Sequence, residues 1–123
     1  MSHTPERGMQ TLERYFAALR TQDWESLGAC LAENVHRTGP YLDVVQGRSA
    51  YVAFLARVIP ALRSYDLRVS RVRELGGASA VAEISEFADV NGVRKEFPEV
   101  LLFDFDAEGS ILRIDIYIKQ PPS

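Results

Sequence analysis

Two glutamates, Glu86 and Glu99, lie on either side of the dipeptide Asn91-Gly92. This dipeptide is typical of a type I′ hairpin turn, whose two central residues both need positive φ. If Val90 pairs with Val93, Glu86 and Glu99 become diagonal neighbours on one face of the hairpin. Two ionised carboxylates on an apolar face are costly unless they share a proton or a cation. The pair is therefore the strongest candidate for acid/base chemistry in this sequence.

The same hairpin register assigns the apolar residues of that face. Ile84 is expected opposite Glu99, and the turn Asp106 to Gly109 pairs Phe105 with Ser110, which places Glu99 opposite Ile116. Besides the glutamates, this inner face then carries Ala82, Ile84, Phe97, Leu101, Phe103, Leu112, Ile114, Ile116 and Ile118. A different outcome stays open, in which Glu86 reaches water at the end of the hairpin and a bulge turns Glu99 to the outer face.

Three helices are expected ahead of the sheet. A stripe of apolar residues at spacings of three and four predicts a helix from about Pro5 to Arg20 (Met9, Leu12, Phe16 and Leu19). Asp23 is a plausible N-cap for a short second helix, in which Trp24, Leu27 and Leu31 share a face. Ser49 could cap a third helix, which Pro60 should end or kink. Its inward residues would be Val52, Leu55 and Ile59, with Phe54 and Val58 nearby.

The rest of the chain has the pattern of β-strands. Short strands are expected at Val35 to Thr38 and then at about Tyr65 to Glu74, Ser79 to Val90, Val93 to Phe105 and Ser110 to Lys119. We therefore predict an α+β fold in which the helices cover a curved antiparallel sheet and enclose an apolar pocket. The expected lining of this pocket is Leu19, Phe54, Leu55, Val58, Ile84, Phe97, Leu101, Phe103, Ile114 and Ile116.

Composition limits the classes of function. The 123 residues fit one domain spanning 1–123, and 46% hydrophobic with 25% charged residues is ordinary globular composition. A formal charge of -3 and scattered arginines give no footprint for nucleic acid or an anionic membrane. No secretory signal is visible, so a cytoplasmic protein is expected. Cys30 is expected to be a buried thiol, and no spacing of ligands predicts a metal or a cofactor.

Several local strings resemble the nuclear transport factor 2-like superfamily. They are Arg14-Tyr15-Phe16, then Asp23, then Leu31-Ala32-Glu33-Asn34-Val35, then Gly47-Arg48 ahead of a helix, and a last hairpin at Phe105 to Ile111. They are most similar to the SnoaL-like, ketosteroid isomerase-like and limonene epoxide hydrolase-like branches. The resemblance covers residues 9 to 119. It implies a cystatin-like roll with a cone-shaped pocket and a dimer built on the outer face of the sheet.

The resemblance to the isomerase implies only part of its catalytic apparatus. Tyr15 matches the helix tyrosine that donates a hydrogen bond to the substrate oxyanion. The catalytic aspartate base is replaced by Gly39, and the protonated aspartate of the oxyanion hole is replaced by Leu101. A steroid isomerase mechanism is therefore not expected.

The epoxide hydrolase uses a triad of two aspartates and a central arginine, and the resemblance leaves most of this triad unmatched. Glu86 matches one of the two aspartates, whereas Ile84 and Ile116 stand at the positions of the central arginine and the other aspartate. Arg37 and Gly39 fall where the hydrolase has its water-positioning tyrosine and asparagine. Arg37 also occupies a first-strand position that faces the pocket in this superfamily.

Two hypotheses follow. In the first, the chain is a cofactor-independent enzyme of the SnoaL-like kind that performs acid/base chemistry on a small, largely apolar molecule, as an isomerase, polyketide cyclase-like cyclase, dehydratase or hydrolase would. Glu86 or Glu99 would be the base, and Tyr15 and Arg37 would stabilise a developing oxyanion. In the second, the same fold is a non-catalytic ligand-binding or dimerisation domain, and Arg37 forms a buried ion pair with one glutamate. In both, apolar residues on the outer face favour a homodimer: Val81, Phe87, Val100, Leu102 and Tyr117.

Overall fold

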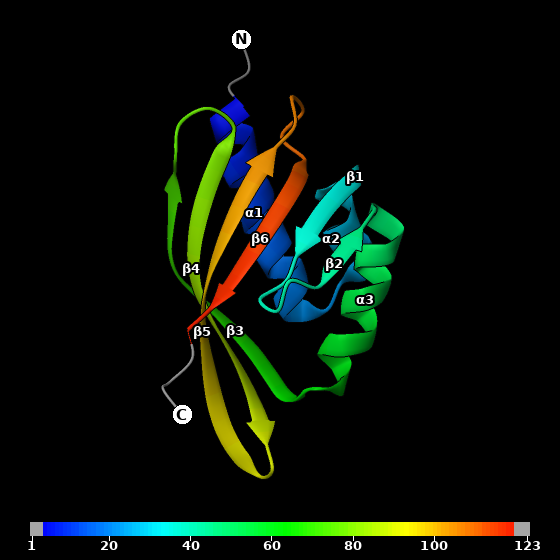
Figure 1. Cartoon of the computed structure of the whole chain (residues 1–123), viewed down its shortest axis with the longest axis vertical. Coiled ribbons are helices and arrows are strands. Elements are labelled where there is room, and N and C mark those ends of the chain that lie inside the picture. The colour runs from blue at the N-terminus through cyan, green and yellow to red at the C-terminus, as the bar shows by residue number, and fades with distance from the viewer. Residues whose placement is uncertain (1–3, 120–123) are drawn as a thin grey trace.

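A computed structural model describes residues 4–119. Three helices precede most of the sheet: α1 (Thr4–Thr21), α2 (Trp24–Ala29) and α3 (Arg48–Ala61). The strands are β1 (Leu31–Thr38), β2 (Val44–Gln46), β3 (Arg63–Glu74), β4 (Ser79–Val90), β5 (Val93–Phe105) and β6 (Ile111–Ile118). Figure 1 shows α1 behind β4, β5 and β6, with α3 beside β1 and β2. The predicted α+β arrangement of helices on a sheet is confirmed.

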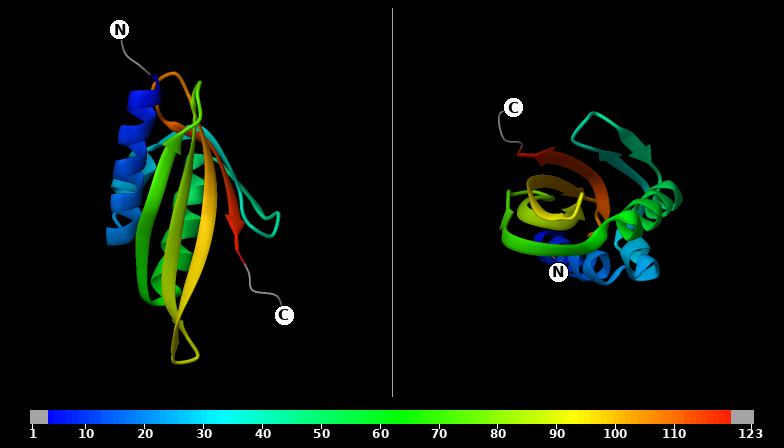
Figure 2. Two further views of the ribbon diagram at one scale, coloured as in Figure 1. Left: turned by 90° about the vertical axis from the view of Figure 1, so that its left-hand side faces the viewer. Right: turned by 90° about the horizontal axis from the view of Figure 1, so that it is seen from below.

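The six strands form one sheet in the order β2-β1-β6-β5-β4-β3. All neighbouring strands are antiparallel except β1 and β6, which are parallel. The sheet is therefore mixed rather than antiparallel throughout. It is strongly curved when seen along the strands (Figure 2), so its concave face can enclose a pocket.

The hairpin of β4 and β5 has the register that its turn predicts. Asn91 and Gly92 both adopt positive φ, at 52° and 77°, and Val90 pairs with Val93. Ile84 consequently pairs with Glu99, and Glu86 pairs with Phe97. Glu86 and Glu99 therefore lie on the same face of adjacent strands, as predicted.

The predicted register of β5 and β6 is wrong by two residues. Glu99 pairs with Ile118, and Leu101 pairs with Ile116. The cause is a bulge next to Phe105, which pairs with Ile111. A shift of two residues keeps each side chain on its face, so most of the inward apolar set is unchanged. The exception is beside the bulge, where Ile111 is buried and Leu112 is only half-buried.

Three details of the N-terminal half also differ from the prediction. Leu31 begins β1 instead of continuing α2, because the Cys30 carbonyl accepts a hydrogen bond from Ile111 N and joins the chain to the sheet. The short edge strand β2 was not predicted. The N-cap of α3 is Gly47 at φ +97°, not Ser49, and Pro60 lies within the last turn of the helix. Asp23 does cap α2, since its side chain accepts a hydrogen bond from Ser26 N at 3.2 Å.

Candidate functional site

A cavity of about 160 Å³ opens between α1, α3 and the concave face of the sheet. An engineered apolar cavity of about 150 Å³ holds benzene, so this cavity has the size of a single ring. Its lining residues are Tyr15, Leu19, Arg37, Pro40, Tyr51, Phe54, Leu55, Val58, Ile59, Leu62, Ile84, Glu86, Glu99, Leu101, Ile116 and Ile118. The set includes all four predicted polar site residues, Tyr15, Arg37, Glu86 and Glu99.

Three residues predicted to line the pocket do not line this cavity. Phe103 and Ile114 are 1% and 0% exposed, because they pack in the core beneath the helices. The ring of Phe103 contacts those of Tyr15 and Phe16 edge to face. Phe97 is half-buried on β5, nearer to the hairpin turn than Glu99. The other predicted apolar lining residues are present: Leu19, Phe54, Leu55, Val58, Ile84, Leu101 and Ile116.

Glu86 and Glu99 interact directly. Glu99 is 5% exposed, and its pKa is raised well above the usual range for a glutamate, first by burial and then by a hydrogen bond with Glu86 and the negative charge of that residue. The positive charge of Arg37 opposes this shift. At neutral pH the Glu99 carboxyl therefore keeps its proton and can donate it.

Glu86, the other member of the pair, is held in position by a hydrogen bond from Tyr65 on β3. The hydroxyl of Tyr65 donates to Oε2 of Glu86 at 2.5 Å, and burial together with the charge of Glu86 raises the pKa of the tyrosine. The pair is thus asymmetric in its surroundings: Glu86 on β4 accepts a hydrogen bond from Tyr65, whereas Glu99 on β5 is buried and has a raised pKa.

Tyr15 has a partner that the sequence did not indicate. Its hydroxyl lies 2.6 Å from the hydroxyl of Tyr51 on α3, and both residues are 1% exposed. Burial raises the pKa of both phenols, so both are protonated at neutral pH. In a pair of phenols one proton serves the contact, and the other remains free to point toward a ligand. Tyr51 could have been found from its spacing, since Tyr51, Leu55 and Ile59 form the buried stripe of α3.

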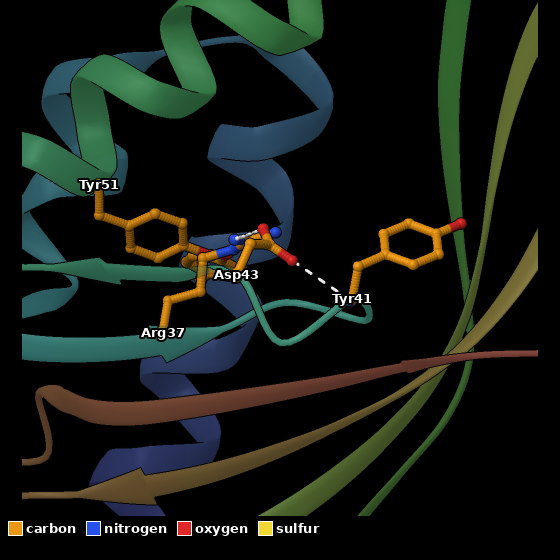
Figure 3. Close-up of polar contacts among 5 residues, drawn as sticks. Arg37, Tyr41, Asp43 and Tyr51 are labelled. Atoms are coloured by element: carbon orange, nitrogen blue, oxygen red, sulfur yellow. Dashed lines mark hydrogen bonds and ion pairs between the residues drawn. The ribbon is translucent and has the colours of Figure 1, made fainter.

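Arg37 bonds to Asp43 and not to a glutamate. Nη1 of Arg37 lies 2.9 Å from Oδ2 of Asp43. Figure 3 shows the two side chains pointing toward each other, and the hydrogen bond from the guanidinium lowers the pKa of that carboxyl. The alternative in which Arg37 forms an ion pair with Glu86 or Glu99 is therefore wrong. Asp43 comes from the loop between β1 and β2, a placement that only the folded chain reveals.

The remaining reactive side chains lie away from the cavity. The Cys30 thiol is buried, as expected, and burial raises its pKa. His36 Nδ1 lies 3.3 Å from Oε1 of Gln46 on the neighbouring strand. In the described part of the chain, histidine, cysteine, aspartate and glutamate side chains nowhere gather in the threes that could hold a metal ion. Within residues 4–119 no helix combines the length and hydrophobicity of a membrane span.

This fold agrees with the comparison to known protein families. The family model of the SnoaL-like domain matches residues 12–114. The chain belongs to the SnoaL-like domain family. No curated protein matches the sequence significantly.

Solved structures with this fold bear several different names. A putative ketosteroid isomerase from Kribbella flavida is 21% identical with a TM-score of 0.81, over 96% of this chain and 82% of the other. An LEH-like epoxide hydrolase from M. tuberculosis is 18% identical with a TM-score of 0.79, over 93% and 84%. A putative polyketide cyclase from Xanthomonas campestris is 25% identical with a TM-score of 0.78, over 95% and 93%. This chain shares the fold of all three, and its own cavity must indicate its chemistry.

Proposed function

We propose that this SnoaL-like domain is a cofactor-independent enzyme that transfers a proton on a small, largely apolar molecule bound in the cavity. The observation that carries the proposal is the asymmetric pair of Glu86 and Glu99. One carboxylate accepts a hydrogen bond from Tyr65, and one buried carboxyl keeps its proton at neutral pH. Two carboxyls whose surroundings differ in this way, in one apolar cavity, can act as a base and an acid on the same ligand.

The catalytic role of each residue follows from its contacts and its burial in the cavity. Glu86 would remove a proton from a carbon next to a carbonyl, and the electrons of the broken C–H bond would move toward the carbonyl oxygen. Glu99 and the free phenol proton of the Tyr15–Tyr51 pair would hydrogen-bond to that oxygen as it gains charge. Return of the proton from Glu86 to another carbon gives an isomerase. Attack of the carbanion on a second carbonyl of the same molecule forms a C–C bond and turns that carbonyl oxygen into an alkoxide, which takes the proton from Glu86; this gives a cyclase.

The size of the cavity limits the substrate. A volume of about 160 Å³ accommodates one ring or a short chain and excludes a four-ring steroid without rearrangement of the lining. The hydrocarbon walls supply most of the affinity through removal of apolar surface from water. We therefore expect a single-ring ketone, lactone or enone.

Deuterium exchange tests the proposal without knowledge of the product. Single-ring ketones, lactones and enones are incubated with the protein in D2O, and loss of the C–H signal next to the carbonyl is followed by proton NMR. Glu86→Gln should slow the exchange about 100-fold or more, the usual contribution of a general base. Glu83→Gln is the matched control, because Glu83 lies on the same strand and bonds to Arg71 on the outer face.

A second candidate function is a ligand-binding domain without catalysis. It is favoured by the internal pairing of Tyr15 with Tyr51 and of Arg37 with Asp43, which leaves fewer polar groups free for a substrate. In one outcome, compounds bind and raise the melting temperature of the protein while their C–H protons exchange no faster with the protein than in buffer alone. That result would support the binding function and contradict the enzyme. A ligand at 100 times its Kd adds about 2.7 kcal/mol of stability, which makes the shift easy to detect.

We also propose that two copies pair through the outer face of the sheet. Val81, Phe87, Val100 and Leu102 are half-buried there and Tyr117 is 57% exposed. Acidic and basic side chains alternate among them, as in the Arg71–Glu83 and Arg113–Asp115 ion pairs. A face that carries both signs of charge can meet a copy of itself without net repulsion.

A further inference from the structure

Arg37 has a buried charge and an exposed partner. Its side chain is 8% exposed, whereas that of Asp43 is 45% exposed, and a single contact from Nη1 joins them. Nε of Arg37 is buried and has no hydrogen-bond partner among the described residues. A buried donor without an acceptor destabilises the fold, because it has lost its hydrogen bonds to water and gained none in return. Part of the hydrogen-bonding capacity of this guanidinium is therefore not satisfied by the described residues.

Aromatic rings hold the guanidinium in place. Its central carbon lies 4.6 Å from the ring centre of Phe54 and 5.9 Å from that of Tyr51. Such contacts orient a guanidinium and partly balance its charge. Because α3 supplies both rings, Arg37 can change its hydrogen-bond partner without leaving the cavity wall.

The loop that carries Asp43 is folded at a conformational cost. Leu42 adopts φ +64° and is 84% exposed, although left-handed backbone is unfavourable for a residue with a branched side chain. Gly39 donates its N–H to the Asp43 carbonyl at 2.7 Å, and a Cβ at Gly39 would overlap the Asp43 carboxylate. Pro40 of the same loop lines the cavity. Loop 39–43 is therefore held in this shape largely by Asp43, next to the place where a ligand would bind.

We propose that Arg37 binds a planar oxygen acceptor of the ligand, a carboxylate or a carbonyl, and that Asp43 holds this position in the unliganded protein. Binding exchanges the contact with Asp43 for a contact with the ligand and releases loop 39–43. A guanidinium recognises a planar acceptor through two parallel N–H groups. Nη1 becomes free for such a contact when Asp43 leaves it, and Nε has no partner to lose among the described residues. The inference concerns the ligand of the cavity proposed above to be catalytic, but it requires binding only.

The charges around Arg37 are consistent with an exchange of partners. Glu99 faces the same cavity as a protonated acid that can donate to the ligand, and Tyr51 is a neutral phenol beside the guanidinium. Asp43 is already in contact with solvent, so an exchange leaves it hydrated and not as a buried unpaired charge. Arg37 is the cationic side chain among the residues that line the cavity, and Glu86, which accepts from Tyr65, is the other lining group that an anionic ligand would meet.

The signal of the Arg37 Nε–H group in a nitrogen-15 NMR spectrum tests the exchange. Benzoate and benzamide are suitable probes, since each is a single ring with a planar acceptor and only benzoate is charged. Movement of the Nε–H signal to lower field with benzoate alone would identify a carboxylate ligand, and movement with both would identify a carbonyl. If neither probe moves the signal, the inference is overturned. Deuterium exchange on the substrate plays no part in this readout, so its outcome is independent of the proposed catalysis.

Competition by Asp43 is tested with a matched pair of variants. Asp43→Asn removes the charge that competes for Arg37, so the Kd of the probe that shifts the signal should fall about tenfold. Asp89→Asn is the control, because it weakens the Arg94–Asp89 ion pair near the hairpin turn of β4 and β5. An unchanged Kd in Asp43→Asn, with the fold intact by circular dichroism, would show that Asp43 does not compete and would overturn the exchange.

Discussion

Two side chains of the same type have different surroundings at this site. Glu86 is half-buried and accepts a hydrogen bond from Tyr65, whereas Glu99 is 5% exposed, and burial, followed by its contact with Glu86, raises its pKa. The difference arises from burial and from neighbours, since the chemistry of the two carboxyl groups is identical. Two residues of the same type can therefore serve as the base and the acid of one site in this fold.

The raised pKa of Glu99 predicts a stability that depends on pH. Above pH 4.5, its ordinary value, the unfolded chain loses a proton that the folded chain keeps, so the free energy of unfolding decreases as pH rises. The contribution of one such group is at most about 1.4 kcal/mol per pH unit. Glu99→Gln should remove this slope and leave the protein equally or more stable at pH 7, since the shape is kept without the proton equilibrium.

Urea unfolding between pH 5 and pH 8 measures the slope. The exposed Glu108 of the turn between β5 and β6 provides the control variant Glu108→Gln, which should retain the wild-type slope. A wild-type slope in Glu99→Gln would mean that Glu99 titrates in the same way in the folded and unfolded chain. The acid in the proposed mechanism would then be lost.

The sequence predicted some of the site residues and missed others for a physical reason. Glu86 and Glu99 follow from the conformation of the Asn91-Gly92 turn, which fixes a register between neighbouring strands. Tyr65 and Asp43 reach the site from β3 and from a loop, and no local rule positions them relative to Glu86 or Arg37. Local geometry is therefore sufficient to predict which side chains are neighbours within one hairpin, but not which side chains meet across distant parts of the chain.

At the scale of the elements, the same limit explains the errors in the sheet. The β4–β5 hairpin was predicted correctly because a two-residue turn permits few registers. The longer turn before β6 adds a bulge, in which Asp106 Oδ1 accepts hydrogen bonds from both Glu108 N and Ser110 N. The parallel pairing of β1 with β6 joins distant parts of the chain, and its register depends on tertiary packing.

The loop between β1 and β2 permits a prediction about the coupling of Gly39 with Asp43. Gly39→Ala introduces a methyl group where the Asp43 carboxylate lies, so the loop must open or the ion pair with Arg37 must break. We expect a loss of about 1–3 kcal/mol, as for overpacking elsewhere. In an Asp43→Ala background the methyl group has room, and the cost of Gly39→Ala should be clearly smaller.

Thermal or urea unfolding of the two single variants and the double variant gives the coupling energy. A difference of at least about 0.5 kcal/mol between the two costs of Gly39→Ala identifies a direct interaction. Equal costs in both backgrounds would show that Gly39 is needed for its own backbone and not for Asp43. The Arg37 Nε–H signal reports in parallel whether the ion pair has been broken.

At the scale of the whole molecule, helices cover one face of the sheet, whereas the other face carries a mixture of apolar and charged side chains. The concave face carries the cavity and is covered by α1 and α3 (Figure 2). Among the described residues, none cover the outer face, where β4, β5 and β6 present half-buried and exposed apolar side chains. A second copy would remove this surface from water and stiffen the strands that hold Glu86 and Glu99.

Leu102→Glu should therefore weaken the proposed dimer. Leu102 is half-buried near the middle of the outer face and pairs with Val81 and Asp115 on the neighbouring strands. In a two-fold interface the substitution adds one carboxylate from each copy, and each new carboxylate lies beside Asp115 of its own chain. Negative charges brought together in an apolar contact repel strongly, so the dimer should dissociate more readily. Sedimentation at micromolar concentration should show a dimer for the wild type and a shift toward monomer, with an increase of Kd of at least tenfold, for the variant. The control and the contradicting outcome are equally specific. Leu75→Glu is the control, because Leu75 is 49% exposed in the turn between β3 and β4, away from this face.

A wild-type monomer at these concentrations, or dimers of equal affinity in the wild type and Leu102→Glu, would rule out pairing through the outer face.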